Sequence, residues 1–428
     1  MTIGGSGRLG EVLKADPERI SGLGNHVLGL NRNVLRTVNM VSGHAGSTGE
    51  FKGLMANLKS PIDGLLDATV SRQKSLSPAL HGTAVNLKQA AWDYTSTDRE
   101  AALGIAHTRE QEYNTNPFIP PAEVVLGTAP DPVVRVPVVD DVPGAVALTA
   151  PREIDVEPPP TESVDWNALI EESAGWLADA DSAIATLTQG WSPIQQALEP
   201  VAGNWMELKR IGKTYGKSGT AFDTIAGDLT SGHAEIDAHW NGSAAVAYTG
   251  YSINMVKGLN WEGSVGRLLE RGLSLAADQL EETAKAIIEL VKKGLGRIVK
   301  VDSFTGALKM AARFVPGAGT ATAVAEVSRM LYEVATAADA MIEQLMAGID
   351  AVKTFIAFCS DPVGFAQGTA DDKVKDELKP FTDFIDDTAD AKQLVTDVST
   401  ATEVRRVSAT PSTAYDPGSG DELWEDQP

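Results

Sequence analysis

A proline-rich stretch is the feature that most limits how this chain can fold. Eleven prolines lie between Asn116 and Ser163, including Pro120-Pro121 and Pro158-Pro159-Pro160. Because proline fixes φ, lacks an amide hydrogen and restricts the residue before it, no α-helix can run through this stretch. We predict a semi-extended linker of polyproline character over residues 113–163, which keeps its neighbours apart. The chain is therefore expected to hold two modules.

Apolar residues before the linker recur with helical spacing. One set steps by three and four residues and so lies on a single helix face: Ile20, Leu23, Val27, Leu30, Val34, Val38 and Val41. Glycines over residues 42–49 end this stripe, and a second stripe starts at Phe51, with Pro61 and Pro78 expected to kink it or to open a helix turn. Two long helices with a short connection pack antiparallel to hide their stripes. Residues 1–112 are therefore predicted to be a helical hairpin.

The region after the linker repeats this pattern on a larger scale. Helical segments are predicted over about 166–208, with breaks near Gly190 and Gly203, and over about 219–238. Longer stripes follow to about residue 356, and aromatic residues make up only 6 % of the chain, as is typical of helix bundles rich in Ala and Leu. We predict an all-α protein whose second module, residues 164–368, is a long-helix bundle.

The carboxyl-terminal segment has a different composition. Residues 369–428 carry clustered acids and few large apolar side chains. We predict an acidic, largely disordered tail, with a helix at most around Phe381, Phe384 and Ile385.

Two short motifs stand at the ends of predicted helices. Trp240-Asn241-Gly242 lies at the reversal between two long segments, where glycine can make the bend and the indole can close the hairpin end. Tyr94 and Asp98 are spaced i and i+4 near the end of the first hairpin, so phenol and carboxylate project from one face.

Neither motif identifies a function by itself. W-x-G and Y-x-x-x-[DE] are each expected about once by chance in a chain of this composition, and a second W-x-G occurs at Trp261-Glu262-Gly263. The plain alternative is that Trp240 is ordinary core and that Tyr94 and Asp98 are an incidental surface pair. Position at the helix ends is what gives the motifs weight.

With these residues the chain resembles a known family of secreted proteins. Residues 1–112, especially 87–102 around Tyr94 and Asp98, resemble the EspC-type targets of actinobacterial type VII (ESX) secretion systems. Residues from about 166 to 300, with His239-Trp240-Asn241-Gly242-Ser243-Ala244-Ala245, resemble the larger WXG-type helical modules of actinobacterial secreted proteins. In this chain the Tyr-based motif and the W-x-G turn fall in different modules.

The resemblance implies an export substrate that acts as a helical binding protein. Tyr94 and Asp98 match the family's export signal, which a hexameric FtsK-like ATPase of the channel is thought to engage, usually with the substrate paired to a second helical hairpin. Trp240, Asn241 and Gly242 match the family's turn. Three arrangements stay open. Either one chain supplies both hairpins of the usual pair, or a separate hairpin protein is the partner, or the chain forms a homo-oligomer. The expected location is the cell surface or the medium, without a Sec signal peptide.

Composition narrows the other function classes. A formal charge of −22 disfavours nucleic acid as a partner. The residues after Met1 lack the apolar stretch of a signal peptide, and the six histidines show no compact ligand spacing. With no nucleophile elbow or Walker A sequence, we expect no enzyme activity, no metal site and no cofactor.

A rival interpretation concerns the last third of the chain. Exported proteins of this kind often carry a carboxyl-terminal toxin, so residues 300–428 could be an effector, either an enzyme or a membrane-active hairpin. The small residues over 314–324 would suit close helix packing in lipid. Acidic side chains such as Glu326 and Glu333 opposite the apolar stripe favour a soluble bundle instead, so membrane contact is the less favoured interpretation.

Overall fold

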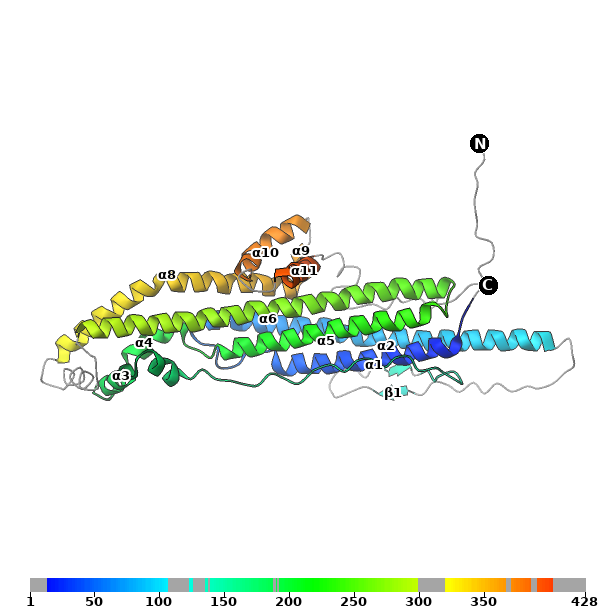
Figure 1. Ribbon diagram of the computed structural model, residues 1–428, viewed down its shortest axis with the longest axis horizontal. Coiled ribbons are helices and arrows are strands. Elements are labelled where there is room, and N and C mark those ends of the chain that lie inside the picture. The colour runs from blue at the N-terminus through cyan, green and yellow to red at the C-terminus, as the bar shows by residue number, and fades with distance from the viewer. Residues whose placement is uncertain are drawn as a thin grey trace, which may run out of the picture.

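The computed structural model describes residues 14–106, 123–125, 135–137, 139–187, 190, 192–298, 320–366, 371–385 and 391–402. These residues form an elongated bundle in which the longest helices run side by side along the molecule (Figure 1). The predicted all-α class is confirmed. Strands within the described residues are limited to β1 (Glu123–Val125) and β2 (Arg135–Pro137), a short antiparallel pair inside the linker.

The amino-terminal module is the predicted helical hairpin. Helix α1 (Pro17–His44) begins with Asp16 as its N-cap, whose carboxylate accepts a hydrogen bond from the backbone of Arg19 at 3.2 Å. Every residue of its predicted apolar stripe is buried. A single 3-10 turn, η1 (Gly53–Met55), leads into α2 (Ala56–Ala106), a continuous helix that includes both Pro61 and Pro78.

The second module is built around another long hairpin. Helices α3 (Trp166–Leu187) and α4 (Pro193–Leu198) and the turn η2 (Glu199–Val201) precede α5 (Met206–Asp237) and α6 (Ser243–Ile298). The predicted breaks are real, because Gly190 and Gly203 both take positive φ, at 102° and 137°. Helix α5 starts well before the predicted residue 219.

Helices α5 and α6 approach each other closely at glycines. A Cβ added to Gly219 would lie 2.5 Å from the carbonyl oxygen of Gly263, and one on Gly266 would lie 2.4 Å from that of Tyr215. No real side chain tolerates such distances, so the glycines allow the two backbones to meet. This contact fixes the register of the hairpin whose turn holds Trp240.

Later helices cover the second hairpin on one side. They are α8 (Thr320–Ser360), α9 (Pro362–Ala366), α10 (Asp371–Ile385) and α11 (Ala391–Thr402). In Figure 1, α8 runs along α6, and the chain then folds back so that α10 and α11 lie over the middle of the bundle. No helix within the described residues is both long enough and apolar enough to cross a membrane.

The helix predicted around Phe381, Phe384 and Ile385 is present as α10, whereas the prediction of disorder is wrong for residues 391–402, which are helical. The ring of Phe381 stacks on that of Phe355 with centroids 4.0 Å apart, and Asp397 is fully buried. The acidic composition misled the prediction because a few buried apolar residues anchor each helix and Asp397 is paired with Arg267 inside the bundle. Residues 403–428 lie outside the described part.

The linker does not keep the modules apart where it is described. Its residues 139–157, which we term the strap, lie against α1 and α5, and the strap buries Val142 and Ile154. The amide of Val146 donates to the carbonyl of Glu18 at 3.0 Å. Helices α1 and α5 also share one hydrophobic cluster, which includes Leu23 and Phe222. The expected separation is therefore wrong for this segment, while residues 107–122, 126–134 and 138 lie outside the described chain.

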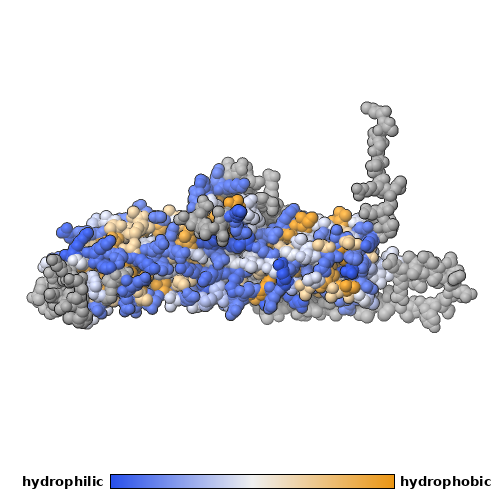
Figure 2. Space-filling model, in the orientation of Figure 1, coloured by the Kyte–Doolittle hydropathy of each residue, from blue (hydrophilic) through white to orange (hydrophobic). Residues whose placement is uncertain are grey.

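A buried polar group joins three helices near the centre. The Arg72 guanidinium of α2 forms an ion pair with Glu262 of α6, and both residues are at most 3 % exposed. The same guanidinium donates to the carbonyl of Cys359 on α8 at 3.0 Å and lies 4.8 Å from the ring centroid of Trp261. Polar residues cover much of the outer surface, interrupted by smaller apolar patches (Figure 2).

Candidate functional site

The turn between α5 and α6 places Trp240 inside the protein. Gly242 takes a φ of 103°, which lets the chain reverse as predicted. Trp240 is 3 % exposed, and its indole lies 5.7 Å from the ring of Tyr248 on α6. The indole therefore closes this end of the second hairpin.

Tyr94 of α2 contacts this turn. The indole Nε1 of Trp240 donates a hydrogen bond to the phenolic oxygen of Tyr94 at 3.3 Å. Tyr94 is partly exposed, so its ring covers Trp240 and also reaches the surface. The structure thus brings together two motifs that stand in different modules of the sequence.

Residues 14–16, which precede α1 and which we term the amino-terminal arm, add a third segment. Ala15 forms an isolated antiparallel bridge with Trp240. The Asn241 amide donates to the Lys14 carbonyl at 2.9 Å, and the Lys14 amide donates to the Asn241 carboxamide at 2.6 Å. The Lys14 ammonium also donates to the carbonyl of Ala238. We term Lys14, Tyr94, Trp240 and Asn241 the hairpin junction.

The strap holds α2 beside the hairpin junction. The Trp92 indole donates to the carbonyl of Asp140 at 2.9 Å, and the Lys88 ammonium lies 2.9 Å from the Asp141 carboxylate. Burial would raise the pKa of Asp141, but hydrogen bonds from Asn25, Lys88 and Ser21 outweigh it and lower that pKa below its ordinary value. The carboxylate is therefore stabilised in its charged form.

Asp98 lies one helical turn after Tyr94 on α2, which stays helical to Ala106. The predicted i, i+4 placement therefore holds for the backbone. The side chain of Asp98 lies outside the described part, so its contacts are not assigned.

The second W-x-G sequence has another role. Trp261, Glu262 and Gly263 lie in the middle of α6, not at a turn. Trp261 is fully buried and donates to the carbonyl of Ala401 on α11 at 3.1 Å. The two W-x-G sequences therefore differ in their place: Trp261 packs within a helix, whereas Trp240 lies at a turn.

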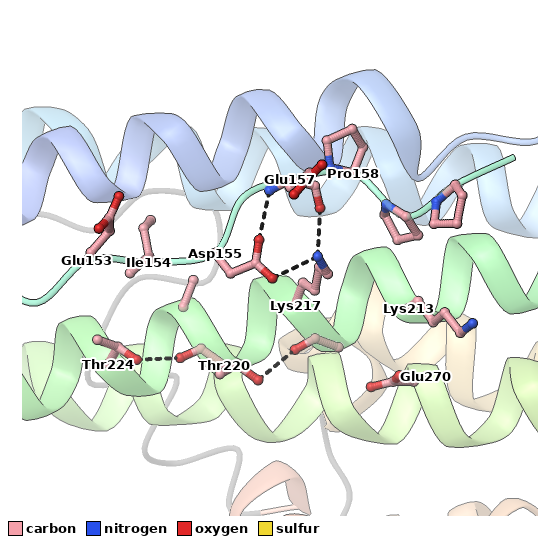
Figure 3. Close-up of a pocket in the computed structure, with 14 residues that line it drawn as sticks. Glu153, Ile154, Asp155, Glu157, Pro158, Lys213, Lys217, Thr220, Thr224 and Glu270 are labelled. Atoms are coloured by element: carbon pink, nitrogen blue, oxygen red, sulfur yellow. Dashed lines mark hydrogen bonds and ion pairs between the residues drawn. The ribbon is translucent and has the colours of Figure 1, made fainter.

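A groove of about 780 Å³ lies between the end of the strap and α5 (Figure 3). The Lys217 ammonium crosses it and donates to the Asp155 carboxylate and to the Glu157 carbonyl, both at 2.8 Å. Burial raises the pKa of Glu270 on the α6 side, and Lys213 offsets part of this effect. Lys217 thus ties the strap to α5. Within the described residues, no group of three or more His, Cys, Asp or Glu side chains is arranged to hold a metal ion.

Sequence reasoning found the turn and the tyrosine but missed Lys14, Trp92 and the strap residues around them. A backbone bridge leaves no pattern in side-chain types, so Lys14 gave no signal. Trp92 offered one, since an indole two residues before Tyr94 is a large group near a proposed recognition site. No family model, no curated protein and no solved structure matches this chain.

Proposed function

We propose that this protein is a substrate of a type VII (ESX) secretion system and is exported to the cell surface or the medium, where it acts as a helical binding protein. The observation that carries the proposal is the hydrogen bond between Trp240 and Tyr94. Through this bond Tyr94, which belongs to the motif that resembles an export signal, contacts Trp240 of the W-x-G turn.

The arrangement of the hairpins supports the proposal. The α1–α2 hairpin and the α5–α6 hairpin pack against each other, with α1 against α5, in a single chain. The family's substrates usually pair with a second helical hairpin. Here the second hairpin is part of the same polypeptide. This favours the interpretation that one chain supplies both hairpins of the pair and needs no separate partner.

The partial exposure of Tyr94 on α2 supports recognition by the ATPase of the secretion channel. Tyr94 keeps part of its side chain exposed while Trp240 behind it is buried, so the phenol is held in place by the fold. A held side chain loses less conformational entropy when a receptor binds it. We propose that an FtsK-like ATPase of the secretion channel reads Tyr94 and Asp98 together.

Secretion of variants tests the proposal. In an actinobacterial host with an active ESX system, Tyr94→Ala and Asp98→Ala should each abolish export while the purified variants keep the helical circular dichroism of the wild type. Tyr332→Ala is the matched control, because Tyr332 on α8 is 74 % exposed, and it should be exported normally. Wild-type protein should stay inside a host that lacks the ATPase.

Two outcomes would overturn the assignment. One is normal export of the Tyr94→Ala, Asp98→Ala double variant. The other is unchanged export from the host without the ATPase.

A further inference from the structure

One face of α6 is covered along part of its length and exposed along the rest. The residues of this face recur with helical spacing: Val246, Gly250, Ile253, Trp261, Ser264 and Leu268. The last three are at most 3 % exposed, whereas Val246 is 71 % and Ile253 48 % exposed. A Cβ added to Gly250 would meet nothing within 4 Å. We term Val246, Gly250 and Ile253 the open face.

Helix α11 covers the buried part of this face. The Trp261 indole donates to the Ala401 carbonyl at 3.1 Å, and the Arg267 guanidinium is paired with Asp397 at 2.6 Å. Contacts that advance from 397 to 401 on α11 therefore move back from 267 to 261 on α6, so the two helices are antiparallel. In Figure 1, α6 extends beyond α10 and α11 toward the α5–α6 turn. The chain thus leaves α11 at Thr402 in the direction of the open face.

We propose that residues 403–409 dock on the open face of α6 and place Val404 and Val407 against it. The docked segment would continue the interface that α11 already forms with α6. This inference concerns the folded chain and does not depend on its export.

The reach of the segment fits the open face. Along α6, Ile253 lies about 12 Å and Gly250 about 16 Å from Trp261, where Ala401 is bonded. In an extended chain, Val404 lies up to about 10 Å and Val407 up to about 20 Å beyond Ala401. Residues three positions apart lie on one side of a polyproline-type chain, which has three residues per turn. Both valines can therefore face α6 at the level of the open face.

Charge favours this segment as the occupant. Lys257 is the only charged residue from Ser243 to Trp261, and it lies between the open face and Trp261. Its ammonium donates to the Asn254 carboxamide at 3.4 Å, which is long for a hydrogen bond. Glu403 directly follows α11 and brings a negative charge to the level of Lys257.

A second copy of the chain is a weaker candidate for the open face. Each chain has a formal charge of −22, so two copies repel each other. Residues 403–409 are tethered beside the open face by α11, which gives them a high effective concentration there. The covalent connection therefore favours docking within one chain.

Thiol labelling of the purified full chain tests the proposal. Gly250→Cys places a reporter on the open face, and the natural Cys359 is fully buried and does not compete. Docking should shield the reporter. Adding Val404→Asp and Val407→Asp should speed its labelling roughly tenfold, because the two valines no longer gain from burial. Helical circular dichroism checks that each variant folds.

Leu423→Asp with Trp424→Asp is the matched control, since it places the same charges farther along the chain and should leave the labelling rate unchanged. Equal labelling with and without the valine substitutions, or the same acceleration in the control, would overturn the proposal. Labelling that slows as the protein concentration rises would show that a second copy covers the open face, which would also overturn it.

A cross-link gives a second measurement that keeps Val404. Val407→Cys combined with Gly250→Cys should form a disulfide within one chain on mild oxidation, because docking brings the two positions together. Ser231→Cys replaces Gly250→Cys in the control. Ser231 is exposed on α5 at about the same height of the hairpin, as the contact of Gly219 with Gly263 sets the register. No disulfide at Gly250, or an equal yield at Ser231, would contradict docking.

Discussion

The indole Nε1 of Trp240 lies 3.3 Å from the phenolic oxygen of Tyr94, and this bond joins residues 146 positions apart. It connects the second helix of one hairpin to the turn of the other. The Asn241 amide next to Trp240 is already bonded to Lys14 of the amino-terminal arm. The position of the Tyr94 side chain therefore depends on the packing of three segments: α2, the α5–α6 turn and the chain around Lys14.

Replacing Trp240 should destabilise the bundle. We expect Trp240→Ala to lower the free energy of unfolding by about 3–5 kcal/mol, because it removes a buried indole and leaves a cavity between Tyr248 and Tyr94. Denaturant unfolding followed by circular dichroism measures the loss. Trp240→Phe, which fills part of the space but cannot donate to Tyr94, should cost less. A loss below about 1 kcal/mol for the alanine variant would mean that the indole is not part of the core.

The buried ion pair of Arg72 and Glu262 makes a second stability prediction. Removing one charge leaves the other unpaired in a buried site, so Arg72→Met and Glu262→Met should each cost about 3–5 kcal/mol. The double variant should recover much of this loss, because two apolar side chains of similar length leave no charge unpaired. Unfolding free energies of the four proteins form a double-mutant cycle. Losses that simply add in the double variant would show that the two groups do not interact.

The helices could be predicted from the sequence because burial follows the helical period. All seven residues of the α1 stripe, from Ile20 to Val41, are buried, and a run of this kind needs no knowledge of the partner helix. The turn at Gly242 could be predicted for a similar reason, since a positive φ is a local requirement.

Contacts between distant segments could not be predicted. The strap is held in part by backbone bonds such as that from Val146 to Glu18, which do not depend on side-chain type. The composition of α11 suggests a solvent-exposed helix. Asp397 anchors it to the bundle through an ion pair with Arg267, which lies 130 positions earlier. The bond between Trp240 and Tyr94 depends in the same way on how the two hairpins align.

Asp141 should make the strap sensitive to acid. Its pKa is lower in the folded protein than the ordinary value of 3.8, so its contribution to stability is complete above that value and is lost as the pH falls through the folded pKa. Asp141→Asn should therefore be less stable than the wild type at neutral pH, and the difference should shrink below pH 3.8. Unfolding free energies measured across this range test the sign.

Lys88 supplies the control for Asp141. In a Lys88→Met background, Asp141→Asn should have a smaller effect at neutral pH, because the 2.9 Å ion pair is already gone. A difference between Asp141→Asn and the wild type that stays constant through the acidic range would contradict the assignment.

The last helix should detach when Asp397 is removed. Asp397 is fully buried and accepts from Arg267 Nε at 3.0 and 3.1 Å and from Nη2 at 2.6 Å, so Asp397→Ala leaves this side of a partly buried guanidinium without its acceptor. Because the guanidinium stays paired with Asp223, we expect a loss of about 1.5–3 kcal/mol, typical of hydrogen bonds to a charged group. Because α11 is a short helix at the edge of the bundle, we expect faster hydrogen exchange over residues 391–402 before the long hairpins open.

Asp383→Ala is the control, since Asp383 pairs with Lys379 on the surface of α10 and should change stability by less than about 1 kcal/mol. Equal exchange in the two variants would show that α11 is held by its apolar contacts alone.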